Sequence, residues 1–169
     1  PWLLHLFLSF LPRKYDKFVE KFTNPFLDSL FVIFLYLVTL HLTASSSQAL
    51  MLITLYVLTP AMFTNLIDGP RLNSFNPRLF GEILGGVIFV LEYLYFLEKS
   101  YIFLVLAVVI AALSFLSSKF TAQAIVFINI LLFLFTFKYE YLAVLFGGLI
   151  LSIILSGGGY LKIFKLQVE

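Results

Sequence analysis

The stretch LFGEILGGVIFVLEYLYFL, residues 79–97, is the clearest structural signal in the sequence. Only Glu82 and Glu92 are charged in it, and the rest is aliphatic, aromatic or glycine. A helix rises about 1.5 Å per residue, so about 20 such residues cross the roughly 30 Å hydrocarbon core of a bilayer. We therefore interpret residues 79–97 as a membrane-spanning helix.

The composition of the whole chain agrees with this interpretation. Of 169 residues, 62% are hydrophobic and 12% are charged, whereas soluble domains have about 45–50% apolar and about 25% charged residues. Too few polar side chains remain to cover a surface that faces water. This excludes a soluble enzyme, a nucleic-acid-binding module and a disordered segment as primary interpretations. The chain has no cysteine, which excludes disulfides, thiolate metal sites and a cysteine nucleophile.

Six apolar stretches approach the length of a membrane span, and short polar segments separate most of them. Short connections force neighbouring helices into antiparallel hairpins. The predicted fold is all-α: a polytopic integral membrane protein with six transmembrane helices in residues 24–169. The predicted spans are residues 26–44, 47–66, 79–97, 100–117, 121–137 and 141–156.

The basic residues support this division, because cytoplasmic loops of membrane proteins carry an excess of lysine and arginine. With six spans and both termini in the cytoplasm, nine basic residues fall on the cytoplasmic side and two on the other. The cytoplasmic set is Arg13, Lys14, Lys17, Lys21, Arg71, Arg78, Lys119, Lys162 and Lys165, and the opposite set is Lys99 and Lys138.

The N-terminal segment, residues 1–23, has a different pattern. Between Pro12 and Thr23, apolar residues recur at helical spacing with lysines between them, which is typical of a helix lying in the headgroup layer. We expect this interfacial helix to precede a turn into the membrane at Asn24–Pro25. It either docks on lipid or a partner, or only keeps its charges out of the bilayer. Residues 1–12 lack the features of a signal peptide.

Small residues form stripes on three of the predicted helices. Within a bilayer, close packing of helices depends on such residues because they let the backbones approach. The stripes predict packing inside the bundle. They consist of Gly81, Gly85 and Gly86, then Ala107 and Ala111, then Ala143, Gly147, Gly148, Ser152 and Ser156.

Four polar residues within the predicted spans are candidate functional residues: Glu92, His41, Asn129 and Gln123. A charge in hydrocarbon costs about 3 kcal/mol on insertion scales, so each buried ionisable group suggests a role. Glu92 shares a helix face with Gly81 and Gly85 and would point into the bundle, either to bind a proton or cation or to join helices by a hydrogen bond. His41 could meet Glu92 at a similar depth and relay protons, or simply lie at the interface. Asn129 and Gln123 are expected to hydrogen-bond across helices.

A second polar cluster lies in the predicted cytoplasmic loop between the second and third spans. Arginines beside asparagines can bind a phosphate or a lipid headgroup. Alternatively, the arginines only fix the topology and the acidic residues are their partners. The candidates are Asn65, Asp68, Arg71, Arg78 and Glu82.

Two functions remain open. The chain is either a non-catalytic membrane subunit or domain that packs with partner helices or lipid, or a small transporter or channel for a small solute, ion or lipid with a proton-titrating Glu92. An enzyme is not favoured, because serine-protease, HExxH, P-loop and GxGxxG motifs are missing. We predict no cofactor and no metal site; the expected partners are membrane lipids and other membrane chains or further copies, not nucleic acid.

Overall fold

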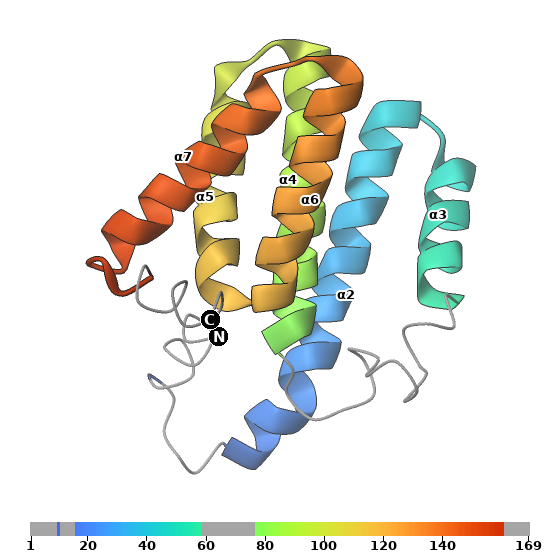
Figure 1. The fold of residues 1–169 in the computed structure, drawn as a ribbon. Helices are drawn as coiled ribbons and strands as arrows, with labels where there is room; N and C mark the ends of the chain where they lie inside the picture. Colours follow the sequence, from blue (N-terminus) through green and yellow to red (C-terminus); the bar gives the residue numbers. More distant parts are fainter. Residues whose placement is uncertain (1–9, 11–15, 59–76, 161–169) are drawn as a thin grey trace. The chain divides into compact units, whose positions relative to one another are not determined.

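The computed structural model describes residue 10 and residues 16–58 and 77–160 of the chain. These residues form six helices, α2 to α7, and no strand occurs among them (Figure 1). The predicted all-α fold is therefore confirmed. The chain divides into two compact units. The first, residues 9–80, contains α2 and α3, and the second, from Gly81 onward, contains α5 to α7 and nearly all of α4.

The first unit is built on an antiparallel hairpin of α2 (Asp16–Thr43) and α3 (Ser46–Leu58). Ala44, with φ of 50°, ends α2 in the left-handed conformation, and its N–H donates to the Leu40 carbonyl at 2.9 Å. Such a residue commonly closes a helix because it redirects the chain while pairing a free carbonyl. The two helices match the first two predicted stretches, although residues 59–66 of the second stretch lie outside the described residues.

α2 passes through Pro25 without a break, which corrects the turn that we expected at Asn24–Pro25. Proline removes one backbone donor and costs about 3 kcal/mol in a helix interior. The helical turns on both sides continue the hydrogen-bond ladder, so a single missing bond does not end the helix. Ser29 Oγ also donates to the Pro25 carbonyl at 2.8 Å. Residues 16–23 are therefore the first turns of α2, not a separate helix.

The second unit consists of four helices joined by very short connections. They are α4 (Pro77–Glu98), α5 (Tyr101–Ser117), α6 (Lys119–Thr136) and α7 (Glu140–Leu155). Lys99 and Phe137, with φ of 56° and 54°, close α4 and α6 in the left-handed conformation, and Ser118 alone joins α5 to α6. As a result, α4 and α6 run in one direction and α5 and α7 in the other (Figure 1), as the sequence predicts for hairpins.

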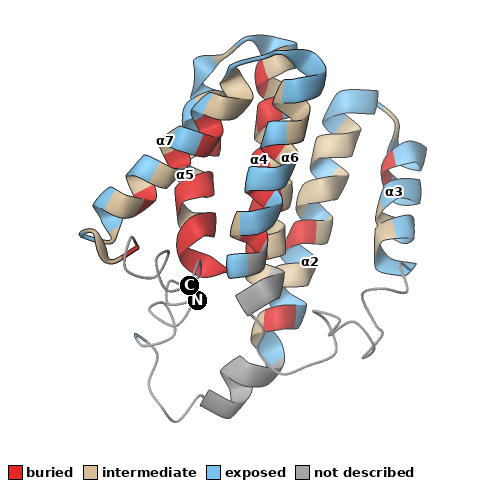
Figure 2. Ribbon diagram, in the orientation of Figure 1, coloured by how far each residue is buried: buried red, intermediate tan, exposed pale blue. Residues whose placement is uncertain are grey.

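The buried residues of the second unit lie along the inner faces of its helices (Figure 2), and several of them are alanine or serine. The core centres on Ile88, Ala107, Ala111, Phe115, Leu116, Ile125, Val144, Leu145 and Tyr160. A Cβ added at Gly148 of α7 would lie 2.7 Å from Ala111 Cβ of α5, so these helices touch through their small residues. The predicted packing role of the stripes is confirmed at these two positions and wrong for Ala143, which is exposed.

Only two described helical segments are both long and apolar enough to cross a membrane: Phe22–Thr43 in α2 and Phe80–Glu98 in α4. Four shorter apolar segments, in α3, α5, α6 and α7, have 10–17 residues each. The support for a membrane association comes only from the length and composition of these helices. The six crossings and the orientation of the termini stay predictions.

Candidate functional site

Polar side chains gather inside the second unit, where a soluble protein would have apolar ones. The buried set in this unit is Glu92, Ser114, Ser117, Ser118, Thr121, Asn129 and Ser152. Ser114, Ser117 and Ser152 donate to carbonyls of their own helices at 2.7–3.0 Å. Such bonds satisfy a hydroxyl without a partner helix, so these serines need no further role.

Glu92 is the most unusual member of this set. It lies on the buried stripe of α4 that also holds Gly81, Gly85 and Ile88, and its side chain is 3% exposed. Both carboxyl oxygens lack a hydrogen-bond partner among the described residues. Buried polar groups are nearly always paired, and each exception calls for an explanation. Glu92 therefore agrees with the predicted inward orientation and is the first candidate for a functional group.

Asn129 lies at a similar depth on the neighbouring helix α6. Its Nδ2 donates to the Ile125 carbonyl at 3.1 Å, while its Oδ1 is buried and no described residue bonds to it. Thr121 of α6 faces Gly81 and Gly85 of α4. At about 1.5 Å per residue, Asn129 lies about 12 Å along α6 from Thr121, and Glu92 lies between about 10 Å and about 16 Å along α4 from Gly85 and Gly81. Two unpaired acceptors thus occur at one level of the unit.

An aromatic and cationic cluster closes the end of the unit beyond Glu92. Lys138 Nζ lies 4.0 Å and Lys99 Nζ 5.3 Å from the centre of the Phe96 ring, and Tyr141 packs on the same ring at 5.1 Å. The two lysines that we predicted on one side of the membrane thus lie at the same end of the unit. Aromatic rings with nearby cations are typical of a membrane interface.

Tyr95 links this cluster to the start of α7. Its hydroxyl donates to Glu140 Oε1 at 3.4 Å, and its ring lies 5.8 Å from that of Tyr101. Glu92 lies about one helical turn before Tyr95 on the same buried stripe of α4. The Glu92 carboxyl therefore lies next to the polar and aromatic end of the second unit, and not in the middle of its apolar core.

The other predicted site residues are less closely associated. His41 is exposed in the last turn of α2 and belongs to the first unit, so its predicted pairing with Glu92 stays a prediction. Glu82 is half-buried in α4 and Gln123 is exposed on α6. Asn65, Asp68 and Arg71 lie outside the described residues. Arg78 belongs to the first turn of α4, but its side chain is outside the described part.

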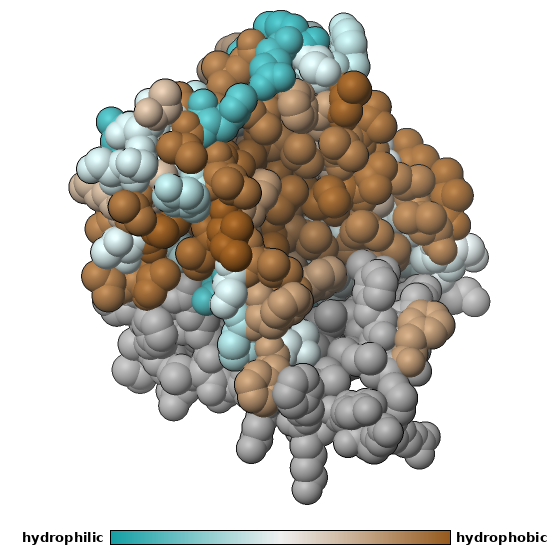
Figure 3. Space-filling model, turned by 180° about the vertical axis from the view of Figure 1, so that it is seen from behind, coloured by the Kyte–Doolittle hydropathy of each residue, from teal (hydrophilic) through white to brown (hydrophobic). Residues whose placement is uncertain are grey.

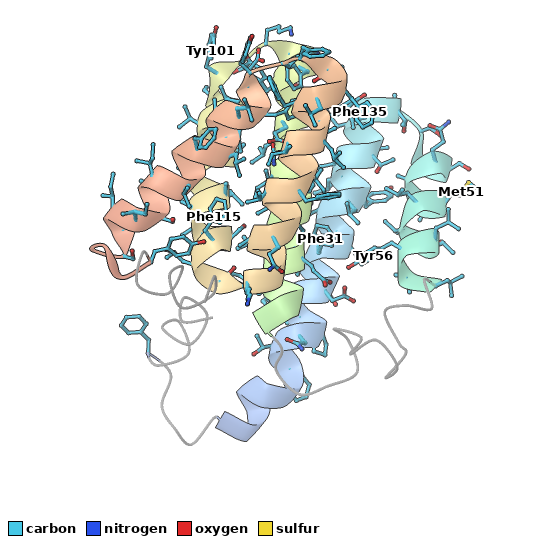
Figure 4. The ribbon with its side chains drawn as sticks, viewed as in Figure 1. Phe31, Met51, Tyr56, Tyr101, Phe115 and Phe135 are labelled. Carbon is cyan, nitrogen blue, oxygen red and sulfur yellow. The ribbon has the colours of Figure 1, made fainter. Side chains whose placement is uncertain are left out.

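The sequence analysis missed one polar contact within the first unit. Asp28 of α2 accepts a hydrogen bond from the Tyr56 hydroxyl of α3 at 3.0 Å. Phe31 packs edge-on against the same tyrosine ring, with centres 5.6 Å apart (Figure 4). A carboxylate two residues inside a predicted span was the available signal. Because Asp28 lies close to the end of that span, hydropathy alone does not single it out.

An apolar groove runs between α6 and α7, and hydropathy alone does not reveal it. Its volume is about 730 Å³, and its walls include Val126, Ile130, Leu134, Phe146 and Leu149. Lys119, Gln123 and Tyr160 line it as well. Neither Glu92 nor Asn129 lines this groove, so the unpaired acceptors and the groove are separate features.

The described residues contain no group of three or more histidine, aspartate or glutamate side chains that could hold a metal ion. No known protein family, no curated protein and no solved structure matches this chain. The function therefore has to be argued from the chain itself.

Proposed function

We propose that this chain is a multi-pass membrane protein that acts as a non-catalytic membrane subunit or domain, packing with partner helices or lipid. One observation carries the proposal: the described helices expose their large apolar side chains and bury polar ones. Phe135, Ile102 and Phe127 are 81%, 68% and 65% exposed, whereas Glu92 is 3% exposed and Asn129 is fully buried.

This distribution is the reverse of what water favours. Scattered exposed apolar residues are normal in soluble proteins, but continuous apolar surface marks an interaction with a membrane or a partner. Hydrophobic residues cover a broad part of the described surface in Figure 3, and hydrophilic residues gather at one end. Lipid tails or partner helices would cover such a surface at little cost.

The packing between helices supports the same conclusion. In lipid, helices associate through close backbone approach and not through the hydrophobic effect. The approach of Gly148 to Ala111 and that of Gly81 to Thr121 are of this kind. The groove between α6 and α7 is apolar along most of its walls and does not include the buried Glu92, which favours a packing module over a transport path.

Labelling of single cysteines tests the proposed topology, because the natural chain has none. Ser46, Lys99, Lys119 and Lys138 are all exposed near helix ends. Each would be changed to cysteine and treated with a membrane-impermeant maleimide in sealed vesicles. Six crossings predict that positions 46, 99 and 138 react from one side and position 119 from the other.

The alternative topology gives a different pattern. If only α2 and α4 cross the bilayer, positions 99, 119 and 138 react from the same side and position 46 from the opposite one. That result would reject the six-span arrangement.

The proposed role as a packing module has its own test. Purification in native lipid should yield bound lipid or further chains, and a solitary lipid-free monomer would contradict this role.

A second function is favoured by one specific observation, the two unpaired carboxyl oxygens of Glu92. A buried carboxyl without partners can serve to bind a proton or cation that crosses the membrane. In this case the chain is a small transporter or channel, and the polar end beyond Glu92 would be the entry side.

Uptake into proteoliposomes tests this second function. Glu92→Gln removes the titrating group while keeping its size, so any pH-dependent uptake should be lost. Glu98→Gln, at the exposed end of the same helix, is the control and should retain uptake. Equal uptake by both variants would eliminate a proton-coupling role for Glu92.

A further inference from the structure

The groove between α6 and α7 has a polar end and an apolar length. Lys119 and Gln123 lie in the first turns of α6, and Tyr160 follows the end of α7. Because α6 and α7 are antiparallel (Figure 1), these three residues lie at the same end of the groove. The opposite end is lined by Leu134 and Leu145.

Two of the groups at the polar end, Lys119 and Gln123, are exposed, and Tyr160 is largely buried. No ion pair involves Lys119 among the described residues. Burial raises the pKa of the Tyr160 phenol, so at neutral pH this hydroxyl stays protonated and can donate a hydrogen bond. A cation, an amide and a phenol at the mouth of an apolar groove match a negatively charged, oxygen-rich headgroup.

We propose that this groove binds one anionic phospholipid, with an acyl chain between α6 and α7 and the phosphate at Lys119. Charge complementarity selects this occupant, because an anionic phospholipid brings an acyl chain to the apolar walls and a phosphate to Lys119. The inference rests on the proposed membrane location and adds a defined lipid site to it.

The dimensions of the groove suit one acyl chain. From Lys119 to Leu134 the wall of α6 is about 22 Å long at about 1.5 Å per residue, which exceeds half of the roughly 30 Å hydrocarbon thickness. The volume of about 730 Å³ is within the range of about 300–1,000 Å³ for small-molecule sites. Lys119 belongs to the predicted cytoplasmic set, so the lipid would come from that leaflet.

The test uses the full chain in nanodiscs of phosphatidylcholine. Each nanodisc sample contains a trace of one photoactivatable lipid, either phosphatidylglycerol or phosphatidylcholine, and the two probes carry the same acyl chains. After irradiation, mass spectrometry identifies the modified peptides. We expect phosphatidylglycerol to label residues of α6 and α7 that line the groove, and to do so more than phosphatidylcholine.

Two substitutions with matched controls separate the headgroup from the chain. Lys119→Gln should lower the preference for phosphatidylglycerol about fivefold, since one lysine near a membrane contributes about 1 kcal/mol, whereas Lys138→Gln at the other end should not. Val126→Trp would fill the groove and reduce labelling by both lipids. Val109→Trp on α5 should leave labelling unchanged, because Val109 has nearly the same exposure, 38% against 37%, but does not line the groove.

The possible failures are distinct. Equal labelling by the two lipids, labelling unaffected by Val126→Trp, or a cross-linked dimer with α6 against α6 would overturn the lipid site while the membrane location stands. A chain that does not enter nanodiscs at all would overturn the proposed function as well.

Discussion

Two acidic residues within the long apolar helices differ in their burial and in their hydrogen bonding. Asp28 of α2 has the Tyr56 hydroxyl as a hydrogen-bond donor, whereas Glu92 of α4 is more deeply buried and has no partner within the described part of the chain. Leaving a buried polar group unpaired costs about 1–3 kcal/mol. The first carboxyl therefore contributes to the α2–α3 hairpin, and the second lowers the stability of its unit.

Replacing Tyr56 tests the value of the bond to Asp28. Tyr56→Phe keeps the ring that packs against Phe31 and removes only the hydroxyl. We expect a loss of about 0.6–1.5 kcal/mol in the free energy of unfolding, the range for hydrogen bonds between membrane helices and in proteins generally. Chemical unfolding in detergent measures it. Tyr36→Phe on α2 serves as the control; an equal loss there would show that the hydroxyl bond to Asp28 is not the cause.

Because Glu92 is unpaired among the described residues, we expect its replacement to raise the free energy of unfolding instead of lowering it. Glu92→Leu removes a buried carboxyl without orphaning any partner, so the unfolding free energy should rise by about 1–3 kcal/mol. Glu140→Leu, which removes the acceptor of the Tyr95 hydroxyl, should bring no such gain. Thermal unfolding in detergent compares the two, and a clear loss on Glu92→Leu would contradict an unpaired carboxyl.

At this scale the sequence predicted burial better than pairing. The seven-residue spacing from Gly85 to Glu92 identifies an inward-facing carboxyl, because it depends only on the helical repeat. The bond between Asp28 and Tyr56 joins residues of two helices and depends on their register, which hydropathy does not encode. Gln123 was expected to bond across helices, but its side chain is exposed and lines the groove. This outcome also depends on helix register, which hydropathy does not encode.

At the scale of helices, the contact of α5 with α7 depends on glycine. A methyl group at Gly148 would approach Ala111 Cβ to 2.7 Å and the backbone nitrogen of Ala112 to 3.3 Å. Neither atom can move without shifting α5 as a whole. At Gly85 the nearest atom would be Thr121 Cγ2 at 3.5 Å, an ordinary contact.

Alanine substitution at these two glycines should therefore have different effects. Gly148→Ala is expected to lower the unfolding free energy by about 1–3 kcal/mol through overpacking. Gly85→Ala should be neutral or stabilising, since alanine is favoured over glycine in a helix by about 1 kcal/mol. Unfolding in detergent, followed by circular dichroism, measures both. Similar effects from the two substitutions would mean that the α5–α7 distance is not fixed by Gly148.

The helix positions could be predicted closely, but one boundary could not. Hydrophobic runs and short polar connections locate α4 to α7 to within a few residues. The break expected at Pro25 is wrong, because the proline rule gives a local cost while the continuation of α2 is decided by the many helical bonds on either side. The cost of one proline is thus smaller than the cooperative stabilisation of the longer helix.

At the scale of the whole molecule, the exposed apolar surface predicts how the chain behaves in cells. It should remain in the membrane fraction after an alkaline carbonate wash and leave it only with detergent. Fractionation and immunoblotting would detect this. Release by carbonate alone would indicate a peripheral protein and contradict the multi-pass arrangement. The membrane association could be inferred from composition, whereas the number of crossings requires the labelling experiment.

The extensive packing of α5 on α7 has a consequence for biosynthesis. The small-residue face of α5 is made early, but its partner leaves the ribosome only after all of α6. During that interval Ala111 lacks its contact with Gly148 of α7, and another protein or a chaperone of the bilayer could occupy that face of α5. The packing of this unit would then be completed only when α7 emerges, and stop codons before residue 140 should yield products that are inserted but rapidly degraded.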